Sequence, residues 1–246
     1  MTTRISTFPQ VAKKKKKDKK DKKEKIDLAE GLSMEAYEQD DKQIVIVNNI
    51  QQPPYSPEPE LRTINLYGDI SEQKGADVVA ALLYLESTSH ALAPMDPSDP
   101  DAEKVVIARS IAMMVSTHGG TASDMFSMLD VMDMVKERTC DIETFGIGKV
   151  MSAGVPILAA GTKGKRKVGR NCRIMLHNVM AGTGGTIFSM ENELEEIKWV
   201  QERYIETLAS YTKLTPSKIR KLLKTQKDVY ISAEEAIKMG IADEII

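Results

Sequence analysis

Three polar residues of types that can perform acyl transfer lie at the edges of apolar segments. Ser152 lies in the motif Gly148-x-x-x-Ser152-x-Gly154, between a strand-like run and a helix-like run. His177 ends a second apolar run, and Asp228 precedes a short apolar segment near the end of the chain. A serine hydroxyl becomes a nucleophile when an imidazole takes its proton and a carboxylate orients that imidazole. If these edges meet at one mouth of a sheet, the residues predict serine-type acyl transfer.

Each of the three residues also has a purely structural interpretation. Ser152 fits the N-cap of a helix, where free N–H groups and the helix dipole also favour a developing negative charge. His177 fits a hydrogen-bonded structural histidine, although an imidazole is also suited to general base catalysis near neutral pH. Asp228 fits a solvated acid between a helix and a strand. The residues taken one at a time therefore leave both interpretations open.

Two consecutive glycines follow an apolar strand at Gly119 and Gly120. Without a Cβ atom, the backbone N–H groups of such a pair can approach a ligand closely. They could supply one donor of an oxyanion hole, with the N–H of Ala153 as the other, and the alternative is an ordinary turn. The glycines at 182–185 do not form a nucleotide loop, because no lysine and serine or threonine of a P-loop follow them. The sequence indicates no cofactor and no metal site.

The pattern of apolar residues alternates between strands and helices from residue 61 onward. Strands are predicted at 62–68, 105–115 (one strand or two), 141–147 and 172–176, with a surface loop at 91–103 and a basic turn at 163–170. Helices are predicted at 76–86, from 123 through 136, and at 153–160, 187–211, 217–223 and 233–239. The alternation predicts an α/β fold of stacked βαβ units with right-handed crossovers.

The first 60 residues differ in composition from the rest of the chain. Residues 1–25 hold 11 basic and three acidic residues, whereas the remainder holds 23 basic and 33 acidic residues. The lysine-rich run cannot bury apolar area, and residues 51–60 are rich in proline, so residues 1–60 are predicted to be a disordered leader and an extended arm. For this leader, the composition favours a solubilising or removable role over nucleic-acid binding. Residues 61–246 are long enough to bury one core.

Composition bears on the compartment as well. Two cysteines, Cys140 and Cys172, are far apart in the sequence, which favours a reducing compartment. No apolar run has the length of a membrane helix, and the first ten residues lack the apolar core of a secretory signal. These observations predict a cytoplasmic protein without membrane contact.

From residue 61 to its end, the chain resembles the proteolytic subunit of Clp protease. The motif at 148–154 is similar to the nucleophile motif of that family, and Arg173-x-Met-x-His177 is similar to its histidine motif. The spacing of 25 residues between Ser152 and His177 and the block that begins at Asp228 also match. The resemblance implies a fold of the Clp-protease and crotonase type, with a protruding helical handle at about 180–211.

The resemblance also implies roles for individual residues. Ser152 would be the nucleophile, His177 the general base and Asp228 the residue that orients it, with the amides of Gly119 and Ala153 as the oxyanion hole. The segments expected to hold an extended substrate by strand addition consist of Gly120, Thr121, Ala122, Met180, Ala181 and Gly182. The implied activity is that of a serine endopeptidase that cleaves peptides or unfolded polypeptides.

The resemblance implies partners too. Copies of the chain would form two stacked rings of seven, joined through the handle, with an AAA+ unfoldase ATPase as a further partner. His118 stands where the family usually has proline, Asn178 and Val179 stand where it has glutamine and proline, and residues 90–104 resemble an insertion. These departures predict a divergent member of the family. If its source is viral, the compartment would be the host cytoplasm, and an organelle lumen is a further alternative to the cytoplasm.

Three other functions remain open at this point. The chain could be a catalytically inactive ring subunit that serves assembly or docking, or a viral capsid-maturation protease with the same chemistry. A third alternative is an acyl-CoA hydratase or isomerase of the crotonase fold. That class usually uses glutamates as acid and base, and no glutamate accompanies the glycine pair or Ser152, so this alternative ranks last.

Overall fold

The computed structural model describes residues 61–95, 98, 99, 102–224 and 227–246, together with the backbone of three strands nearer the N-terminus. The chain divides into two units, residues 1–60 and residues 61–246, which are described separately. The lysine-rich run up to residue 22 and the proline-rich segment 51–60 lie outside the described residues. The predicted leader and arm therefore stay a prediction.

The first unit contains a small antiparallel sheet. Its strands are β1 (Lys23–Leu28), β2 (Leu32–Glu38) and β3 (Ile44–Val47), in the order β1-β2-β3. Glu24 pairs with Ala36, and Ala36 pairs with Ile46 on the other side, so β2 is the central strand. Of the three strands, only β3 consists entirely of apolar residues.

A seven-stranded sheet forms the centre of the second unit, and it is almost entirely parallel. Its main path runs β11-β10-β8-β7-β4, while β9 pairs with β8 and with β12. Only β10 and β11 pair antiparallel. The strands are β4 (Thr63–Tyr67), β7 (Ile111–Thr117), β8 (Ile142–Met151), β9 (Arg166–Val168), β10 (Arg173–Leu176), β11 (Val229–Ile231) and β12 (Glu244–Ile245).

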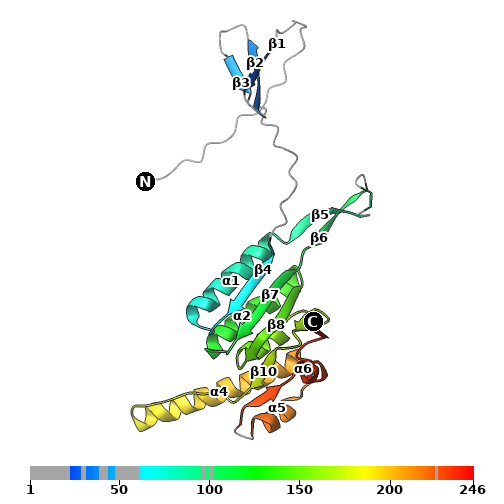
Figure 1. Ribbon diagram of the computed structural model, residues 1–246. Coiled ribbons are helices and arrows are strands. Elements are labelled where there is room, and N and C mark those ends of the chain that lie inside the picture. The colour runs from blue at the N-terminus through cyan, green and yellow to red at the C-terminus, as the bar shows by residue number, and fades with distance from the viewer. Residues whose placement is uncertain are drawn as a thin grey trace. The chain divides into compact units, whose positions relative to one another are not determined.

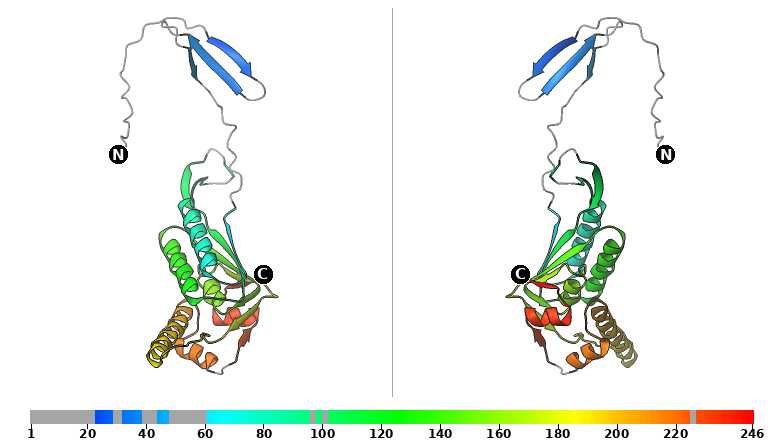
Figure 2. Two further views of the ribbon diagram at one scale, coloured as in Figure 1. Left: turned by 90° about the vertical axis from the view of Figure 1, so that its left-hand side faces the viewer. Right: turned by 90° about the vertical axis from the view of Figure 1, so that its right-hand side faces the viewer.

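Helices connect the parallel strands, as right-handed crossovers require. Helices α1 and α2 lie side by side along one face of the sheet, and α4 extends away from the body at the end near β10 (Figures 1 and 2). The helices are α1 (Glu72–Ser87), α2 (Ala122–Arg138), α3 (Gly154–Ala159), α4 (Ile187–Tyr211), α5 (Pro216–Leu223) and α6 (Ala233–Met239). The architecture is the α/β fold that the alternation of elements predicted.

The core lies between the sheet and the helices α1, α2 and α3. Alternate residues of β7 are buried, from Ile111 through Met113 and Val115 to Thr117. Three of the four methionines of α2, namely Met125, Met128 and Met132, are fully buried in this core. Thioether side chains therefore fill the space that aromatic residues, scarce in this chain, would otherwise occupy.

Two local predictions were wrong. The predicted loop at 91–103 contains β5 (His90–Pro94), which pairs antiparallel with β6 (Lys104–Ala108) in a hairpin that projects from the body (Figure 1). The predicted basic turn at 163–170 contains β9, whose Arg166 is buried. Both segments lacked a strand signal, because prolines and acids dominate the first and lysines and glycines the second.

Candidate active site

The carboxyl ends of three neighbouring parallel strands meet at one edge of the sheet. In the register of β8 and β10, Met151 lies opposite Met175, so Ser152 and His177 follow directly at the ends of adjacent strands. In the register of β7 and β8, Thr117 lies opposite Val150, which brings the Gly119-Gly120 pair to the same edge. Open α/β sheets bind ligands outside the carboxyl ends of their strands. The topology thus brings the three sequence motifs together.

Ser152 lies in a tight turn between β8 and α3. Its φ of +53° is the only positive value at a non-glycine residue in the described part of the chain. A residue with a side chain in this left-handed region costs about 1–3 kcal/mol, and such residues concentrate at functional sites. The Ser152 N–H donates to the carbonyl of Met175 at 2.8 Å, and its carbonyl accepts from the N–H of Val155 at 3.0 Å. The surrounding structure therefore imposes the conformation.

Ser152 and His177 line one pocket of about 330 Å³. Backbone segments after β7 and after β10 form its two walls, and the buried ring of Tyr204 on α4 contributes to it. The complete lining consists of His118, Gly120, Thr121, Ala122, Met125, Ser152, Ala153, His177, Asn178, Val179, Met180 and Tyr204. The pocket therefore brings the serine and the histidine that the sequence singled out to one hollow of the surface.

Two amide N–H groups at the pocket have no hydrogen-bond partner among the described residues. One is that of Ala153, which follows Ser152, and the other is that of Gly120. The Gly120 amide is left free because the bridge to Ile70 uses only the carbonyl of Gly119, at 2.8 Å, and the amide of Thr121, at 3.0 Å. Paired amide donors beside a nucleophile are the arrangement that stabilises an oxyanion.

Gly119, which the sequence suggested as an oxyanion donor, has a different environment. Its N–H donates to the Oγ1 of Thr117 at 2.9 Å, and it does not line the pocket. A Cβ atom built on Gly119 would lie 2.6 Å from the Cβ of Ser152, at a φ of +101°. The residue therefore has to be glycine for the chain to pass beside Ser152.

The N-terminus of α2 also faces the pocket through Thr121 and Ala122. The Thr121 side chain makes no capping hydrogen bond, so N–H groups of the first turn of this 17-residue helix remain free. Such an end carries a partial positive charge and favours an anion nearby. It adds to the two free amides in favouring negative charge in the pocket.

His177 and Asp228 occupy facing positions at the end of an antiparallel pair. Leu176 of β10 pairs with Val229 of β11, so the next step of the same register brings His177 and Asp228 opposite each other. Facing residues of antiparallel strands have Cβ atoms about 4.5–5.5 Å apart. No hydrogen bond joins Ser152, His177 and Asp228 within the described residues, and Asp228 is exposed. The backbone places the three residues at the ends of neighbouring strands, but no hydrogen bond joins their side chains in the single chain.

The segments expected to hold substrate differ in what they offer. The Thr121 amide is engaged by Ile70, and Ala122 begins α2. On the other wall, residues 180–182 are exposed and outside any strand, and the side chain of Met180 is 81% exposed. This second wall therefore has the backbone groups that strand addition by an extended peptide would use.

Two residues of the pocket, His118 and Tyr204, had no predicted role in the site. The Nδ1 of His118 lies 3.9 Å from a carboxylate oxygen of Asp69 at the mouth of the pocket. The hydroxyl of Tyr204 donates to the carbonyl of Ser152 at 3.4 Å, and burial raises the pKa of Tyr204, so this hydroxyl remains a donor. A tyrosine within the apolar stripe of a helix was the available signal, because a buried hydroxyl needs a partner.

Other nucleophiles receive no support in this region. Both cysteines are buried, and burial raises the pKa of Cys172 to about 11 and raises that of Cys140 as well. A thiol is reactive as the thiolate, which these environments disfavour. Within residues 61–246, as far as they are described, no three histidine, cysteine, aspartate or glutamate side chains are grouped closely enough to hold a metal ion. Likewise no helix in that part is long and apolar enough to cross a membrane.

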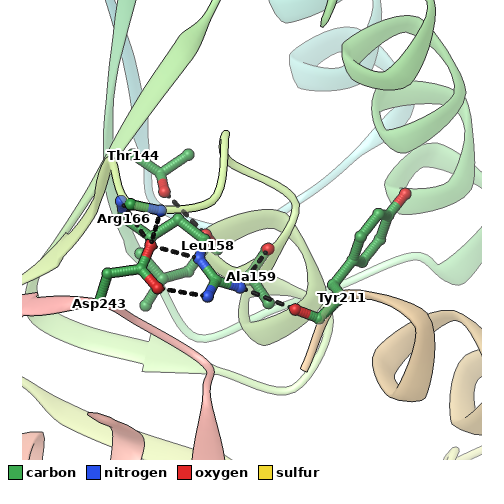
Figure 3. A network of polar contacts seen from close by, with 7 residues as sticks. Thr144, Leu158, Ala159, Arg166, Tyr211 and Asp243 are labelled. Atoms are coloured by element: carbon green, nitrogen blue, oxygen red, sulfur yellow. Dashed lines mark hydrogen bonds and ion pairs between the residues drawn. The ribbon is translucent and has the colours of Figure 1, made fainter. Parts of the chain in front are cut away.

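The far end of α3 is held by a dense polar network (Figure 3). Arg166 is only 4% exposed, and its Nε and Nη2 donate to the two carboxylate oxygens of Asp243 at 2.8 and 2.6 Å. Its Nη1 donates to the carbonyl of Ala159 in α3, at 3.1 Å, and to that of Tyr211, the last residue of α4, at 2.7 Å. This guanidinium holds the pKa of Asp243 below its usual range. The network fixes the helix that follows Ser152.

The fold and the pocket define an α/β protein whose serine, histidine and amide donors meet at the edge of a parallel sheet. The family model described as Clp protease matches residues 102–246. The chain is 31% identical over 193 residues to the protein named ATP-dependent Clp protease proteolytic subunit 2 from Corynebacterium jeikeium (strain K411), an alignment that covers 78% of this chain and 82% of the relative. The chain therefore belongs to the Clp protease family, and the resemblance found in its motifs is confirmed.

Proposed function

We propose that the protein is a serine endopeptidase in which Ser152 is the nucleophile, His177 the general base and Asp228 the residue that orients the imidazole. The observation that carries this proposal is the position of Ser152. It lies in a left-handed turn, on the wall of a pocket shared with His177, beside two unpartnered amides. Membership of a peptidase family supports the same assignment.

The reaction would proceed in two steps through an acyl-enzyme. The Oγ of Ser152 attacks the peptide carbonyl carbon while its proton passes to His177, and the amides of Ala153 and Gly120 stabilise the oxyanion. His177 then gives the proton to the leaving amine as the C–N bond breaks. In the second step His177 takes a proton from a water molecule as that water attacks the ester. The imidazole then gives the proton to the Oγ of Ser152 as the ester C–O bond breaks. Each step returns the imidazole to its starting state.

The oxyanion hole is proposed here with Gly120 in place of Gly119. The Gly119 amide would have to leave Thr117 before it could bind an oxyanion, whereas the Gly120 amide needs no such change. Gly119 would instead act by its lack of a side chain. The N-terminus of α2 would add to the stabilisation of negative charge.

The proposed substrate is an extended or unfolded polypeptide. Residues Met180, Ala181 and Gly182 would pair with it as an added strand, while Gly120, Thr121 and Ala122 form the facing wall. An extended chain fits because this wall offers exposed backbone groups rather than a closed, shaped cavity. Cytoplasmic location remains part of the same proposal.

Assembly is proposed to occur through α4, the handle. Its N-terminal half exposes apolar side chains that one chain alone leaves uncovered, namely Ile187, Phe188, Leu194 and Trp199. Contact between two copies would bury this surface. We propose two stacked rings of seven copies with the active sites inside, and an AAA+ unfoldase ATPase that feeds substrate. The relative from Corynebacterium jeikeium is named as ATP-dependent and as a subunit, which supports both partners.

A fluorophosphonate probe tests the proposed nucleophile. The probe should form a covalent adduct at Ser152 in the assembled protein, located by mass spectrometry of its peptides. Ser152→Ala should abolish both the adduct and peptide cleavage, because loss of a triad serine costs on the order of 10⁴ to 10⁶ in rate. Ser123→Ala, a substitution of another serine near the pocket, should change neither. An adduct at a different serine, or cleavage by Ser152→Ala, would refute the assignment.

One observation favours a second function, that of an inactive ring subunit. The side chains of Ser152, His177 and Asp228 share no hydrogen bond in the single chain. If assembly does not align them, the protein would serve assembly or docking only. Absence of any probe adduct in rings of confirmed mass would establish this alternative. Cleavage of folded proteins only in the presence of an unfoldase would in turn exclude a capsid-maturation protease.

A further inference from the structure

Two side chains of α4 contact the two backbone segments that carry the proposed catalytic residues. The hydroxyl of Tyr204 donates to the carbonyl of Ser152 at 3.4 Å. The Oε1 of Gln201 accepts from the N–H of Val179 at 2.8 Å, two residues after His177. Residues three apart on a helix lie on the same face, so one face of α4 spans the pocket from the serine side to the histidine side.

Tyr204 is well suited to hold the serine turn. Its ring is 5% exposed, so its hydroxyl has little access to water, and the Ser152 carbonyl is its hydrogen-bond partner. The same carbonyl accepts from Val155, while the Ser152 N–H is bound by Met175. Because the turn has a strained φ, each of these bonds opposes its relaxation. Tyr204 is the member of this set that comes from outside the sheet and α3.

Gln201 holds the histidine side and has a donor to spare. Acceptance from the Val179 amide fixes which amide atom is the oxygen, so the remaining atom is the Nε2 donor. That Nε2 is buried and has no partner among the described residues. A buried donor without an acceptor costs about 1–3 kcal/mol. Any shift of residues 177–180 that offers a carbonyl to Nε2 would therefore be favoured.

We infer that Tyr204 and Gln201 are positioning residues that set the separation of Ser152 and His177. This inference rests on the proposed function, because it assumes that these two residues form the reacting pair. Tyr204 anchors the nucleophile turn to α4, and Gln201 anchors the segment that carries the base to the same helix. The unpartnered Nε2 is free to bind a carbonyl of the histidine segment if that segment moves closer to α4. Helix α4 thereby adds one hydrogen bond to each of the two segments that follow the strands β8 and β10.

Tyr204→Phe tests the serine side while keeping the buried ring. We expect kcat for peptide hydrolysis and the rate of fluorophosphonate labelling to fall about three- to tenfold, as the loss of one hydrogen bond implies, with KM and native mass unchanged. Tyr211→Phe is the matched control. It removes a tyrosine hydroxyl bond on the same helix, from Tyr211 to Asp133 at 2.5 Å, away from the pocket. This control should leave kcat at the wild-type value.

Gln201→Met tests the histidine side. It keeps the side-chain length, removes the acceptor for Val179 and removes the unpartnered donor. We expect a similar fall in kcat, and recovery in Gln201→Glu, which retains an acceptor oxygen at that position. Glu202→Gln is the control on the adjacent residue, where only an exposed ion pair with Arg220 is lost. Its kcat should equal that of the wild type.

The outcomes separate this inference from the proposed function. If wild-type rings show no adduct at Ser152, the proposed function fails regardless of these variants. If the wild type is labelled and both Tyr204→Phe and Gln201→Met retain full kcat and labelling rate, the proposed function stands and the positioning inference is overturned. Equal losses in Tyr211→Phe and Tyr204→Phe would also overturn it, because a general loss of helix stability would then explain both.

Discussion

The two ends of α3 differ in how completely their polar groups are satisfied. At the far end, Arg166 binds Asp243 and the carbonyls of Ala159 and Tyr211, while Thr144 donates to the Leu158 carbonyl at 2.7 Å. At the near end, the amide of Ala153 has no hydrogen-bond partner among the described residues, Ser152 has a positive φ, and the side chains of the proposed triad share no hydrogen bond there. We call the end of this six-residue helix at Ala159 and Ala160 the closed end, and the end at Ser152 and Ala153 the open end.

The contrast indicates that one end of α3 fixes the position of the helix and the other end carries the strained turn. A strained turn persists only when its surroundings determine it strongly, and the Arg166 network, shown in Figure 3, supplies that constraint from the opposite end. Lys136 adds to it by donating to the carbonyl of Ala160 at 2.6 Å. The open end can leave the Ala153 amide without a partner because the closed end holds the helix in place.

Asp243→Asn should break the closed end and have the largest effect on stability. It leaves the Arg166 guanidinium, 4% exposed, without its counter-charge. Breaking one partner of a fully buried pair costs about 3–5 kcal/mol, and because Asp243 is 24% exposed we expect a loss at or below the lower end of that range. Chemical denaturation would measure the loss. Glu206→Gln is the control, since it breaks an exposed pair with Arg203 and should change stability by less than about 1 kcal/mol. Equal effects of the two variants would contradict the role given to the network.

Gly119→Ala should disrupt the open end. Its Cβ would lie 2.6 Å from that of Ser152 at a φ of +101°, so the proposed nucleophile has to move. Displacement of a reacting group by about 1 Å can cost about 100-fold in rate, and we expect at least that loss of peptide hydrolysis. Gly184→Ala, where nothing lies within 4 Å of the new Cβ, is the matched control and should keep full activity. A fully active Gly119→Ala would show that the glycine is not required beside Ser152.

The stability of the fold should depend on pH through Asp243, which lies at the closed end. The pKa of Asp243 is lowered in the folded state, chiefly by its hydrogen bonds with Arg166, so this carboxylate stabilises the fold above the ordinary aspartate pKa. That contribution should be lost as the pH falls below about 4 and through the depressed folded pKa. Unfolding measured between neutral pH and acid should show a steeper loss in the wild type than in Asp243→Asn. If stability fell equally with pH in the two proteins, ionisation of Asp243 would not contribute to the stability of the fold.

The smallest predicted effect concerns the strain at Ser152. Glycine adopts a positive φ freely, whereas alanine has the same Cβ cost as serine. Ser152→Gly should therefore be more stable than Ser152→Ala by about 0.5–1 kcal/mol, although both are inactive. Thermal unfolding of the two variants side by side would measure the difference. A more stable alanine variant would show that the turn is not strained at this residue.

The sequence predicted much of this molecule. Alternating apolar segments predicted the α/β fold, and the helix at 187–211 has the predicted ends. Ser152 and His177 were expected at the edges of their strands, and they share a pocket. These predictions succeed because periodicity and local motifs are properties of neighbouring residues.

Other features depend on contacts that neighbouring residues do not reveal. Tyr204 and Gln201 fit an ordinary amphipathic helix, and only the packing of α4 shows that they face Ser152 and Val179. Gly119 and Gly120 are alike in the sequence, and only the bond from the Gly119 amide to Thr117, together with the bridge to Ile70, shows that the Gly120 amide is the free one. Long-range hydrogen bonds of this kind require the fold before they can be assigned.

The most direct test is labelling of Ser152 by a fluorophosphonate, combined with native mass spectrometry, in the wild type and in His177→Ala. If an imidazole takes the serine proton across the pocket, wild-type rings should carry the adduct at Ser152. Rings of His177→Ala should have the same mass and label at least about 100-fold more slowly. Equal labelling rates in the two proteins, or an adduct on any other residue, would contradict the catalytic assignment.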